Sequence, residues 1–403
     1  MPAYSGKFQY AGEKGEILSQ GPCQVSFDAE TCVVTPAGGT ALAFDLGDID
    51  RTVPAEWDLQ LALYTARTVT LRQFGAAFSD MARELLAAWR DRTVQCLLLE
   101  DLEEEGRYTG LANGAPAEIR IFKSKVAILP QAAMPFQWRL AEVGKLQFDD
   151  AAYSITLTRG DEQLALSKLA RKTDEVLGKL TGALGALREH SATVLHGVFP
   201  FLNADQLSRL LQLMPEGSSA SLAAMDAIHP RLSEALIAHA VDEPLKPYFD
   251  DLRSRAASEP LMAGFKFIRP DEGTTAGTET DPEADAEPVF FWFWVPLPGN
   301  LAAWESTSGS GRATYFFRAE PPFASSAASL TRGLALVNFR REPLYLPESS
   351  LAEQQRYHRY AIGARKLSDL RRLRTAYVGR AIHGSLETWQ AQVADLASPR
   401  QGL

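Results

Sequence analysis

Hydrophobic and polar residues alternate along the chain from Val25 to Leu71, and the spacing changes after that point. The alternation is seen in the runs ALAFDL, DLQLAL and TVTL, and a period of two predicts half-buried antiparallel strands. From about residue 76 to residue 91 the apolar positions recur every three to four residues, at Phe78, Met81, Leu85 and Trp89. This spacing predicts an amphipathic helix, so residues 1–100 are expected to form a strand meander closed by one helix.

The same order of patterns returns in the next part of the chain. When Pro36 is aligned with Pro130, an offset of 94 residues, apolar positions coincide along both copies. At this offset the aligned sets are Leu42, Phe44, Leu46 and Ile49 with Phe136, Trp138, Leu140 and Val143, and Leu59, Leu61 and Leu63 with Tyr153, Ile155 and Leu157. At an offset of 95 they are Val69, Leu71 and Phe74 with Leu164, Leu166 and Leu169, and Met81, Leu85 and Trp89 with Val176, Leu180 and Leu184. An internal repeat therefore predicts a second module of the same design over residues 101–192, closed by a helix from about residue 167 to residue 190.

Short strands, tight turns and a single terminal helix within about 95 residues resemble the pleckstrin-homology (PH) superfold. The tandem pair over residues 15–190 resembles the double PH-like modules of histone chaperones and of some membrane-trafficking proteins. The resemblance implies binding modules without catalysis. It leaves the ligand open, because one fold serves many functions.

Basic residues around the first hairpin are typical of the PH members that bind phosphoinositides. The corresponding turn of the first copy reads FDAETC, with two acids and no base. The second copy reads IRIFKSKVAIL and supplies an anion or lipid candidate, Arg120, Lys123 and Lys125. Three scattered cations more often form a solvated face, so a protein or peptide is expected as the partner rather than a membrane lipid.

The remaining residues predict a helical subdomain over 193–260 and an α+β domain over 261–403. Segment 271–288 holds seven acidic residues and no basic ones, so it is expected to be a disordered loop. A helix is expected near residues 324–337 and a helical tail over 351–397. The strand patterns of this domain are Met262–Ile268, Val289–Leu297, Leu301–Glu305 and Ala313–Arg318. Whether they form a third, diverged PH-like copy or a separate domain stays open, and the fold class is α+β.

The charge is unevenly distributed. The net charge of −9 argues against a chain that coats nucleic acid with its whole surface. Locally the balance reverses, because Arg356–Arg380 contains eight Lys and Arg residues against one acid, Asp369. Two acidic segments, Glu100–Glu105 and Asp271–Glu287, are candidate internal partners of these cations.

The basic tail has the spacing of an amphipathic helix that packs on a core and presents its cations outward. The apolar positions on the inner face are Ile362, Leu370, Leu373 and Tyr377. The binding candidates are Arg356, Arg359, Arg365, Lys366, Arg371, Arg372 and Arg374.

Sequence motifs assign no catalytic, metal or cofactor site. The six histidines show no metal-ligand spacing, and the chain has no GxSxG nucleophile motif. The run SGSGR at Ser308–Arg312 is flanked by strand patterns and predicts a hairpin turn rather than a phosphate loop. Neither catalytic residues nor a cofactor are therefore expected.

Cysteine usage and hydropathy indicate a cytoplasmic protein. Three cysteines (Cys23, Cys32 and Cys96) form no CxxC pair, which favours inert thiols in a reducing compartment. The first residues lack the apolar stretch of a signal peptide, and the longest apolar run, Val289–Leu297, is too short to span a membrane.

The favoured hypothesis is a non-enzymatic adaptor that binds a protein or peptide through a strand edge, the groove beside a terminal helix, or the basic tail. A nucleic-acid-associated factor that uses Arg356–Arg380 is the alternative. The third hypothesis is an enzyme with a site near Trp304, Glu305 and Arg312. The oligomeric state and the identity of the partner stay open.

Overall fold

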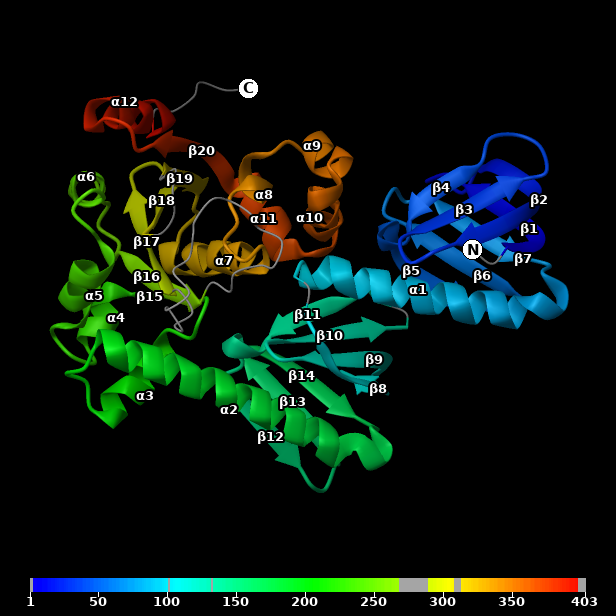
Figure 1. The fold of residues 1–403 in the computed structure, drawn as a ribbon, viewed down its shortest axis with the longest axis horizontal. Coiled ribbons are helices and arrows are strands. Elements are labelled where there is room, and N and C mark those ends of the chain that lie inside the picture. Colours follow the sequence, from blue (N-terminus) through cyan, green and yellow to red (C-terminus); the bar gives the residue numbers. More distant parts are fainter. Residues whose placement is uncertain (1–2, 101, 132, 268–288, 308–312, 398–403) are drawn as a thin grey trace, which may run out of the picture. The chain divides into compact units, whose positions relative to one another are not determined.

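The computed structural model describes residues 3–100, 102–131, 133–267, 289–307 and 313–397 (Figure 1). The chain forms two compact units, Met1–Ala183 with Pro347–Ser368, and Leu184–Leu346 with Asp369–Leu403. A segment close to the C-terminus therefore belongs to the same unit as the N-terminal residues. The predicted acidic loop 271–288 and the predicted turn 308–312 lie outside the described residues.

The first module is a sheet of seven antiparallel strands in the order β4-β3-β2-β1-β7-β6-β5. Its strands are β1 (Ala3–Ala11), β2 (Ile17–Phe27), β3 (Thr31–Pro36), β4 (Leu42–Asp45), β5 (Ile49–Pro54), β6 (Asp58–Leu63) and β7 (Thr68–Arg72). A short 3₁₀ helix, η1 (Leu46–Asp48), joins β4 to β5, and the helix α1 (Phe78–Leu98) follows the last strand. Inward-facing strand residues share one hydrophobic core with Met81, Leu85 and Trp89 of α1, as the spacing predicts.

The second module repeats this strand order as β11-β10-β9-β8-β14-β13-β12. Its strands are β8 (Glu104–Ala112), β9 (Ala115–Phe122), β10 (Lys125–Pro130), β11 (Phe136–Arg139), β12 (Lys145–Asp149), β13 (Ser154–Arg159) and β14 (Glu162–Ser167). The helix α2 (Thr173–Val198) follows, and Val176, Leu180 and Leu184 are buried on it.

One strand of the second module is shifted against the predicted alignment. Leu59 pairs with Leu71 in the first sheet, and Ile155 pairs with Leu166 in the second. Leu59 therefore corresponds to Ile155, whereas the predicted partner, Tyr153, is 47% exposed. A shift by two residues keeps the same side chains on the same face, so periodicity alone cannot detect it. The common strand order is observed, and the duplication itself stays a prediction.

The second unit contains a six-stranded antiparallel sheet in sequential order from β15 to β20. Its strands are β15 (Ser219–Ser221), β16 (Met262–Phe267), β17 (Val289–Leu297), β18 (Leu301–Ser306), β19 (Ala313–Arg318) and β20 (Tyr377–Ile382). The accompanying helices are α3 (Ala204–Leu213), α4 (Leu222–Asp226), α5 (Leu232–Ala240), α6 (Lys246–Ser254), α7 (Phe323–Leu336), α8 (Glu342–Tyr345), α11 (Ser368–Ala376) and α12 (Leu386–Ala397). This strand order differs from that of the two modules, and the whole chain is α+β, as predicted.

The basic stretch 356–380 is divided among α10 (Gln355–Lys366), α11 and β20, whereas a helical tail is predicted over 351–397. After α9 (Glu348–Glu353), the helix α10 is separated from α11 by one residue, Leu367. Tyr377–Ile382 then forms a strand, and Tyr377 pairs with Phe317 of β19 instead of lying on a helix face. Pairing with β20 satisfies the backbone hydrogen bonds along β19. The spacing of apolar residues in the tail does not reveal this requirement, because β19 is distant in sequence.

Candidate functional site

The helix α10 lies against the first module and buries one side of its last turns. Ile362 is fully buried, and a side chain added at Gly47 of η1 would place its Cβ 3.0 Å from Ile362 Cδ1. The closest backbone approach is at Gly363. A Cβ there would lie 2.8 Å from Leu99 Cδ2 and 3.1 Å from the carbonyl oxygen of Cys96. A larger residue here requires the Leu99 side chain to move and the backbone of α1 to give by a few tenths of an ångström.

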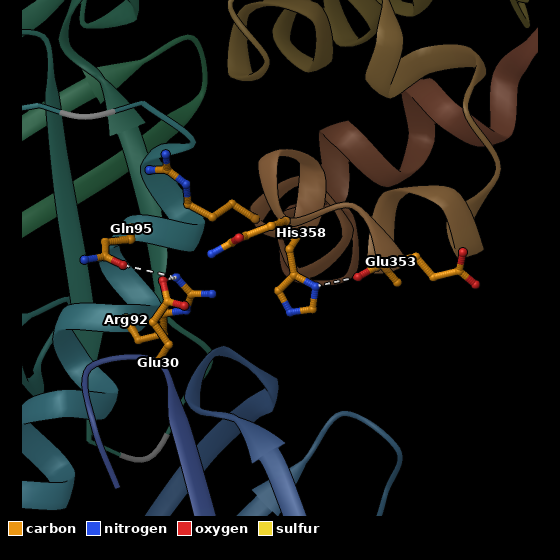
Figure 2. Close-up of a pocket in the computed structure, with 8 residues that line it drawn as sticks. Glu30, Arg92, Gln95, Glu353 and His358 are labelled. Carbon is orange, nitrogen blue, oxygen red and sulfur yellow. Dashed lines mark hydrogen bonds and ion pairs between the residues drawn. The ribbon is translucent and has the colours of Figure 1, made fainter. Parts of the chain in front are cut away.

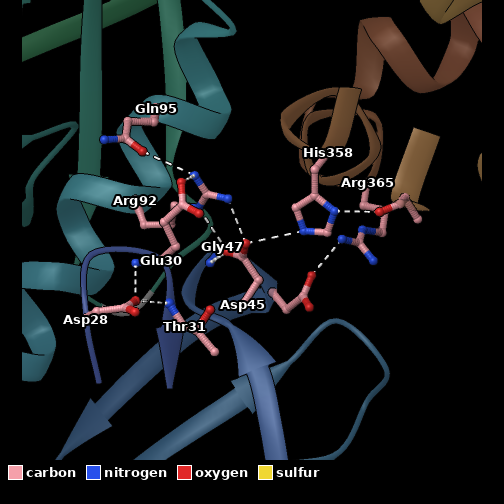
Figure 3. Close-up of polar contacts among 11 residues, drawn as sticks. Asp28, Glu30, Thr31, Asp45, Gly47, Arg92, Gln95, His358 and Arg365 are labelled. Atoms are coloured by element: carbon pink, nitrogen blue, oxygen red, sulfur yellow. Dashed lines mark hydrogen bonds and ion pairs between the residues drawn. The ribbon is translucent and has the colours of Figure 1, made fainter. Parts of the chain in front are cut away.

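Two cations at the end of α10 reach η1 and the start of β5. The Arg365 guanidinium lies 2.6 Å from Asp48 Oδ1 (Figure 3). Lys366 Nζ donates to the carbonyl oxygen of Ile49 at 2.9 Å and lies 3.2 Å from Asp50 Oδ1. The Lys366 side chain is 2% exposed, so its ammonium is held inside the protein.

We call the surface that receives α10 the docking face. It consists of Asp45, Gly47, Asp48, Ile49, Asp50, Arg92, Cys96 and Leu99. Three of these residues supply carboxylates, so the face complements a cationic helix.

Arg92 of α1 fixes the centre of the docking face. Its guanidinium donates to both carboxylate oxygens of Asp45, at 3.0 and 2.7 Å, and to Glu30 Oε1 at 2.9 Å (Figure 3). Asp45 also accepts from the Gly47 amide at 2.6 Å and thereby caps η1. All these partners belong to the first module itself, so its own residues hold the carboxylate in place.

His358, near the beginning of α10, contacts both the docking face and α9. Its Nε2 lies 3.3 Å from Asp45 Oδ2, and its Nδ1 lies 2.9 Å from the carbonyl oxygen of Ala352. Both ring nitrogens therefore face oxygen atoms of the protein.

A polar pocket of about 550 Å³ opens beside this contact. Figure 2 shows Glu30, Arg92 and Gln95 on one side and His358 and Glu353 on the other. The remaining lining residues are Ala352, Gln355 and Arg359. The lining residues include carboxylates, cations and amides, so the pocket presents no single charge to a ligand.

Burial works against the charges of the docking contact. Burial raises the pKa of Asp48, and the nearby Arg365 opposes this shift. Burial likewise lowers the pKa of Lys366, and Asp50 opposes the shift through its charge and hydrogen bond. For Arg92 burial lowers the pKa, but the hydrogen bond to Asp45 and the charges of neighbouring groups, Asp45 and Glu30 among them, together outweigh burial and the net shift is upward. Because desolvation offsets the attraction between the charges, the ion pairs add little net stability. A partner with unmatched charges would still be disfavoured, so the contact favours matched partners.

The buried ammonium predicts a pH dependence. Because the pKa of Lys366 is lowered from 10.5 in the folded chain, the unfolded chain binds more protons between the lowered pKa and 10.5. The free energy of unfolding therefore rises with pH in that window. The stability gained there is lost again as the pH falls through the lowered pKa of Lys366. Lys366→Met removes the titrating group, and the Ile49 carbonyl keeps the Trp89 indole N–H as a donor.

We expect the stability of the unsubstituted chain, relative to the Lys366→Met variant, to increase as the pH rises from the lowered pKa of Lys366 toward 10.5. Urea unfolding followed by tryptophan fluorescence measures both chains at each pH. A difference that stays constant across this range would contradict the expectation.

The structure separates the predicted cationic candidates. Arg365 and Lys366 lie in the docking contact, and Arg359 lines the pocket. Arg374 of α11 donates to the carbonyl oxygens of Pro343 and Leu346. The three other candidates are exposed, namely Arg356, which stacks on Tyr357, and Arg371 and Arg372 of α11.

The predicted anion or lipid candidates are mostly internal. Arg120 is 3% exposed and pairs with Glu118 at 2.6 Å and Asp91 at 2.7 Å. Lys125 is 2% exposed and donates to the carbonyl oxygen of Leu98 at 2.8 Å. Of the three, Lys123 alone is exposed. Two of the three cations thus lie inside the protein against α1 instead of on the solvated face expected at that turn, and anion or lipid binding by these residues stays a prediction.

The residues named for an enzyme site are buried in the second unit or lie outside the described residues. Trp304 and Glu305 are 0% exposed, and successive residues of β18 point to opposite faces. Glu305 Oε2 accepts from Thr314 Oγ1 at 2.6 Å and lies 3.3 Å from His383 Nε2. Arg312 lies outside the described residues. The carboxylate thus belongs to a polar network of the core.

Within the ranges that the structure describes, no group of three or more His, Cys, Asp or Glu side chains is placed to hold a metal ion. In the same ranges, none of the helices has both the length and the hydropathy needed to cross a membrane. Burial raises the pKa of the thiols of Cys23, Cys32 and Cys96, to about 11, 12 and 12 respectively, so these thiols are unreactive in the folded chain.

Sequence reasoning missed the carboxylates of the docking face. It named Glu100–Glu105 and Asp271–Glu287 as internal partners, whereas Arg365 and Lys366 contact Asp48 and Asp50. The available signal was the run DLGDID, residues 45–50, which places three carboxylates within six residues.

A comparison with models of protein families and with curated proteins finds no match. Among solved structures, the pleckstrin homology (PH) domain of USP37 is similar at 18% identity and a TM-score of 0.19, covering 22% of this chain and 98% of that chain. The Spt16D Pob3N heterodimer is similar at 14% identity and a TM-score of 0.18, covering 40% of this chain and 84% of that chain. The first unit contains two seven-stranded antiparallel sheets, each followed by a helix.

Proposed function

We propose that this chain is a non-enzymatic interaction protein, an adaptor whose first module binds helical segments of proteins through the docking face. The observation that carries the proposal is the occupied docking face itself. In this chain α10 is bound there by matched polar groups. The helix is distant in sequence, because its Arg365 and the Asp48 that it contacts are separated by 317 positions.

The composition of the contact favours recognition of protein over other ligands. A buried isoleucine, a close backbone approach at a glycine and two charge contacts together require a helix of defined sequence. Such helix-in-groove recognition is a common mode of peptide binding.

A peptide supplied in trans tests the proposal. The probe is a fluorescein-labelled peptide of residues 352–368, and the receptor is the full chain carrying Arg365→Glu and Lys366→Glu, whose own α10 is weakened at the docking face. We expect saturable binding by this receptor and binding about tenfold weaker or more by the unsubstituted chain, where α10 occupies the face. Fluorescence anisotropy measures both.

The matched control is the same peptide with Arg365→Glu and Lys366→Glu, which should not bind. A second receptor carries Arg365→Gln and Lys366→Gln, which removes the two positive charges without adding negative ones. This receptor is used if charge reversal unfolds the first module. Absence of saturable binding to both receptors up to about 1 mM, the weak end of specific affinities, would overturn the proposal.

The nucleic-acid alternative retains the exposed pair Arg371 and Arg372. Three of its cations, Arg365, Lys366 and Arg374, are engaged within the protein. Retention of the chain on duplex DNA at low salt, abolished by Arg371→Glu with Arg372→Glu, would favour this alternative over an adaptor.

A further inference from the structure

The contacts of α10 specify which helix the docking face accepts. His358, Ile362 and Lys366 are spaced four residues apart, and Arg365 lies three residues after Ile362. These positions share one side of a helix, so the contacting side chains form a continuous stripe. Each of them meets a different group of the docking face.

We infer that the docking face selects partner helices with the pattern Ile-Gly-x-Arg-Lys, and that α10 is an internal competitor whose docking excludes such a partner. The inference rests on the proposed function and adds the class of partner and its regulation. The partner is a cationic amphipathic helix with a glycine facing the first module.

The glycine is required by geometry. At Gly363 a Cβ would meet the Cys96 carbonyl oxygen at 3.1 Å, and this oxygen belongs to the backbone of α1 and cannot rotate away. A larger side chain has to push the two helices apart, which breaks the shorter contacts beside it.

The terminal lysine is required by burial. Its ammonium reaches the Ile49 carbonyl, which also accepts from the Trp89 indole at 3.1 Å. The side chain is 2% exposed, so little room remains for a planar guanidinium with its additional donors. Arg365 is less confined, at 21% exposed, and supplies the charge contact with Asp48.

Competition follows from the shared groups. The Ile362 side chain is fully buried, and one carbonyl and two carboxylates receive the cationic pair. A second helix of the same pattern needs the same atoms, so the two helices exclude each other. Cys96 reports which state is present, because its thiol lies beside Gly47 at the contact and the Lys366 charge acts on it.

Four labelled peptides of residues 352–368 test the pattern on the full chain carrying Arg365→Glu and Lys366→Glu. One peptide has the native sequence, and the others carry Gly363→Leu, Lys366→Arg or Lys366→Glu. We expect the native peptide to bind and each substituted peptide to bind about tenfold weaker or more. Leucine favours a helix more than glycine does, so helix propensity would strengthen rather than weaken the Gly363→Leu peptide.

The same mixtures are treated with a maleimide to follow Cys96. Binding of the native peptide should slow the modification of Cys96, because the peptide covers the face that the substituted α10 has left. Equal binding of the Gly363→Leu and native peptides would overturn the pattern and leave the proposed function standing. Binding without protection of Cys96 would overturn the competition, and failure of every peptide to bind would overturn the proposed function as well.

Discussion

Arg92→Met is expected to lower the free energy of unfolding of the first module by about 3–5 kcal/mol, because it leaves a buried carboxylate without its partner. The Asp45 side chain is 11% exposed and accepts two charge-assisted hydrogen bonds from Arg92. Removing the guanidinium leaves this charge desolvated. All three cysteines lie in the first module, so thiol modification in a urea gradient, read by mass spectrometry at Cys32, measures this module within the full chain.

Arg83→Met on the same helix is the matched control. The Arg83 side chain is 69% exposed and pairs with Asp80 at 2.7 Å, and exposed pairs contribute about 0–1 kcal/mol. Equal effects of the two substitutions would show that Arg92 does not act through buried charge.

Charge reversal at Arg365 and Lys366 is expected to raise the rate of maleimide modification of Cys96 by about 100-fold or more. The new carboxylates would face Asp48 and Asp50 and release α10 from the docking face. Cys96 is fully buried in the folded chain, so release of the helix opens a path to its thiol. Mass spectrometry of the modified chain gives the rate at each cysteine.

Cys32 provides the internal reference, since it lies in the core of the sheet and should keep its slow rate. Charge reversal at Arg371 and Arg372, which are exposed on α11, serves as the control of equal charge and should leave Cys96 protected. A parallel rise at Cys96 and Cys32 would indicate unfolding of the module and not release of α10.

The strands and closing helices of the two modules could be predicted from the sequence because their periodicity is local. Met81, Leu85 and Trp89 are buried on α1 as the spacing predicts, since the face of a helix is set by neighbours within two turns. The register around Tyr153 could not be predicted, because a displacement by two residues leaves the alternation unchanged.

The candidate site was predicted only on its cationic side. Arg365 and Lys366 stood out by local charge, but the same signal selected Arg371 and Arg372, which are exposed on another helix. Asp48 and Arg365 are 317 positions apart, and no local pattern identifies which carboxylate a cation meets at that separation.

The sequence by itself determined the α+β class, the order of strands and helix in each module, and the cationic character of residues 356–380. Those properties depend on spacing and composition within short windows. The tertiary structure alone decided that the tail divides into α10, α11 and β20, and that Arg365 and Lys366 lie on the docking face. Burial, close approach at Gly363 and the pairing of distant charges arise only when the folded chain brings those residues together.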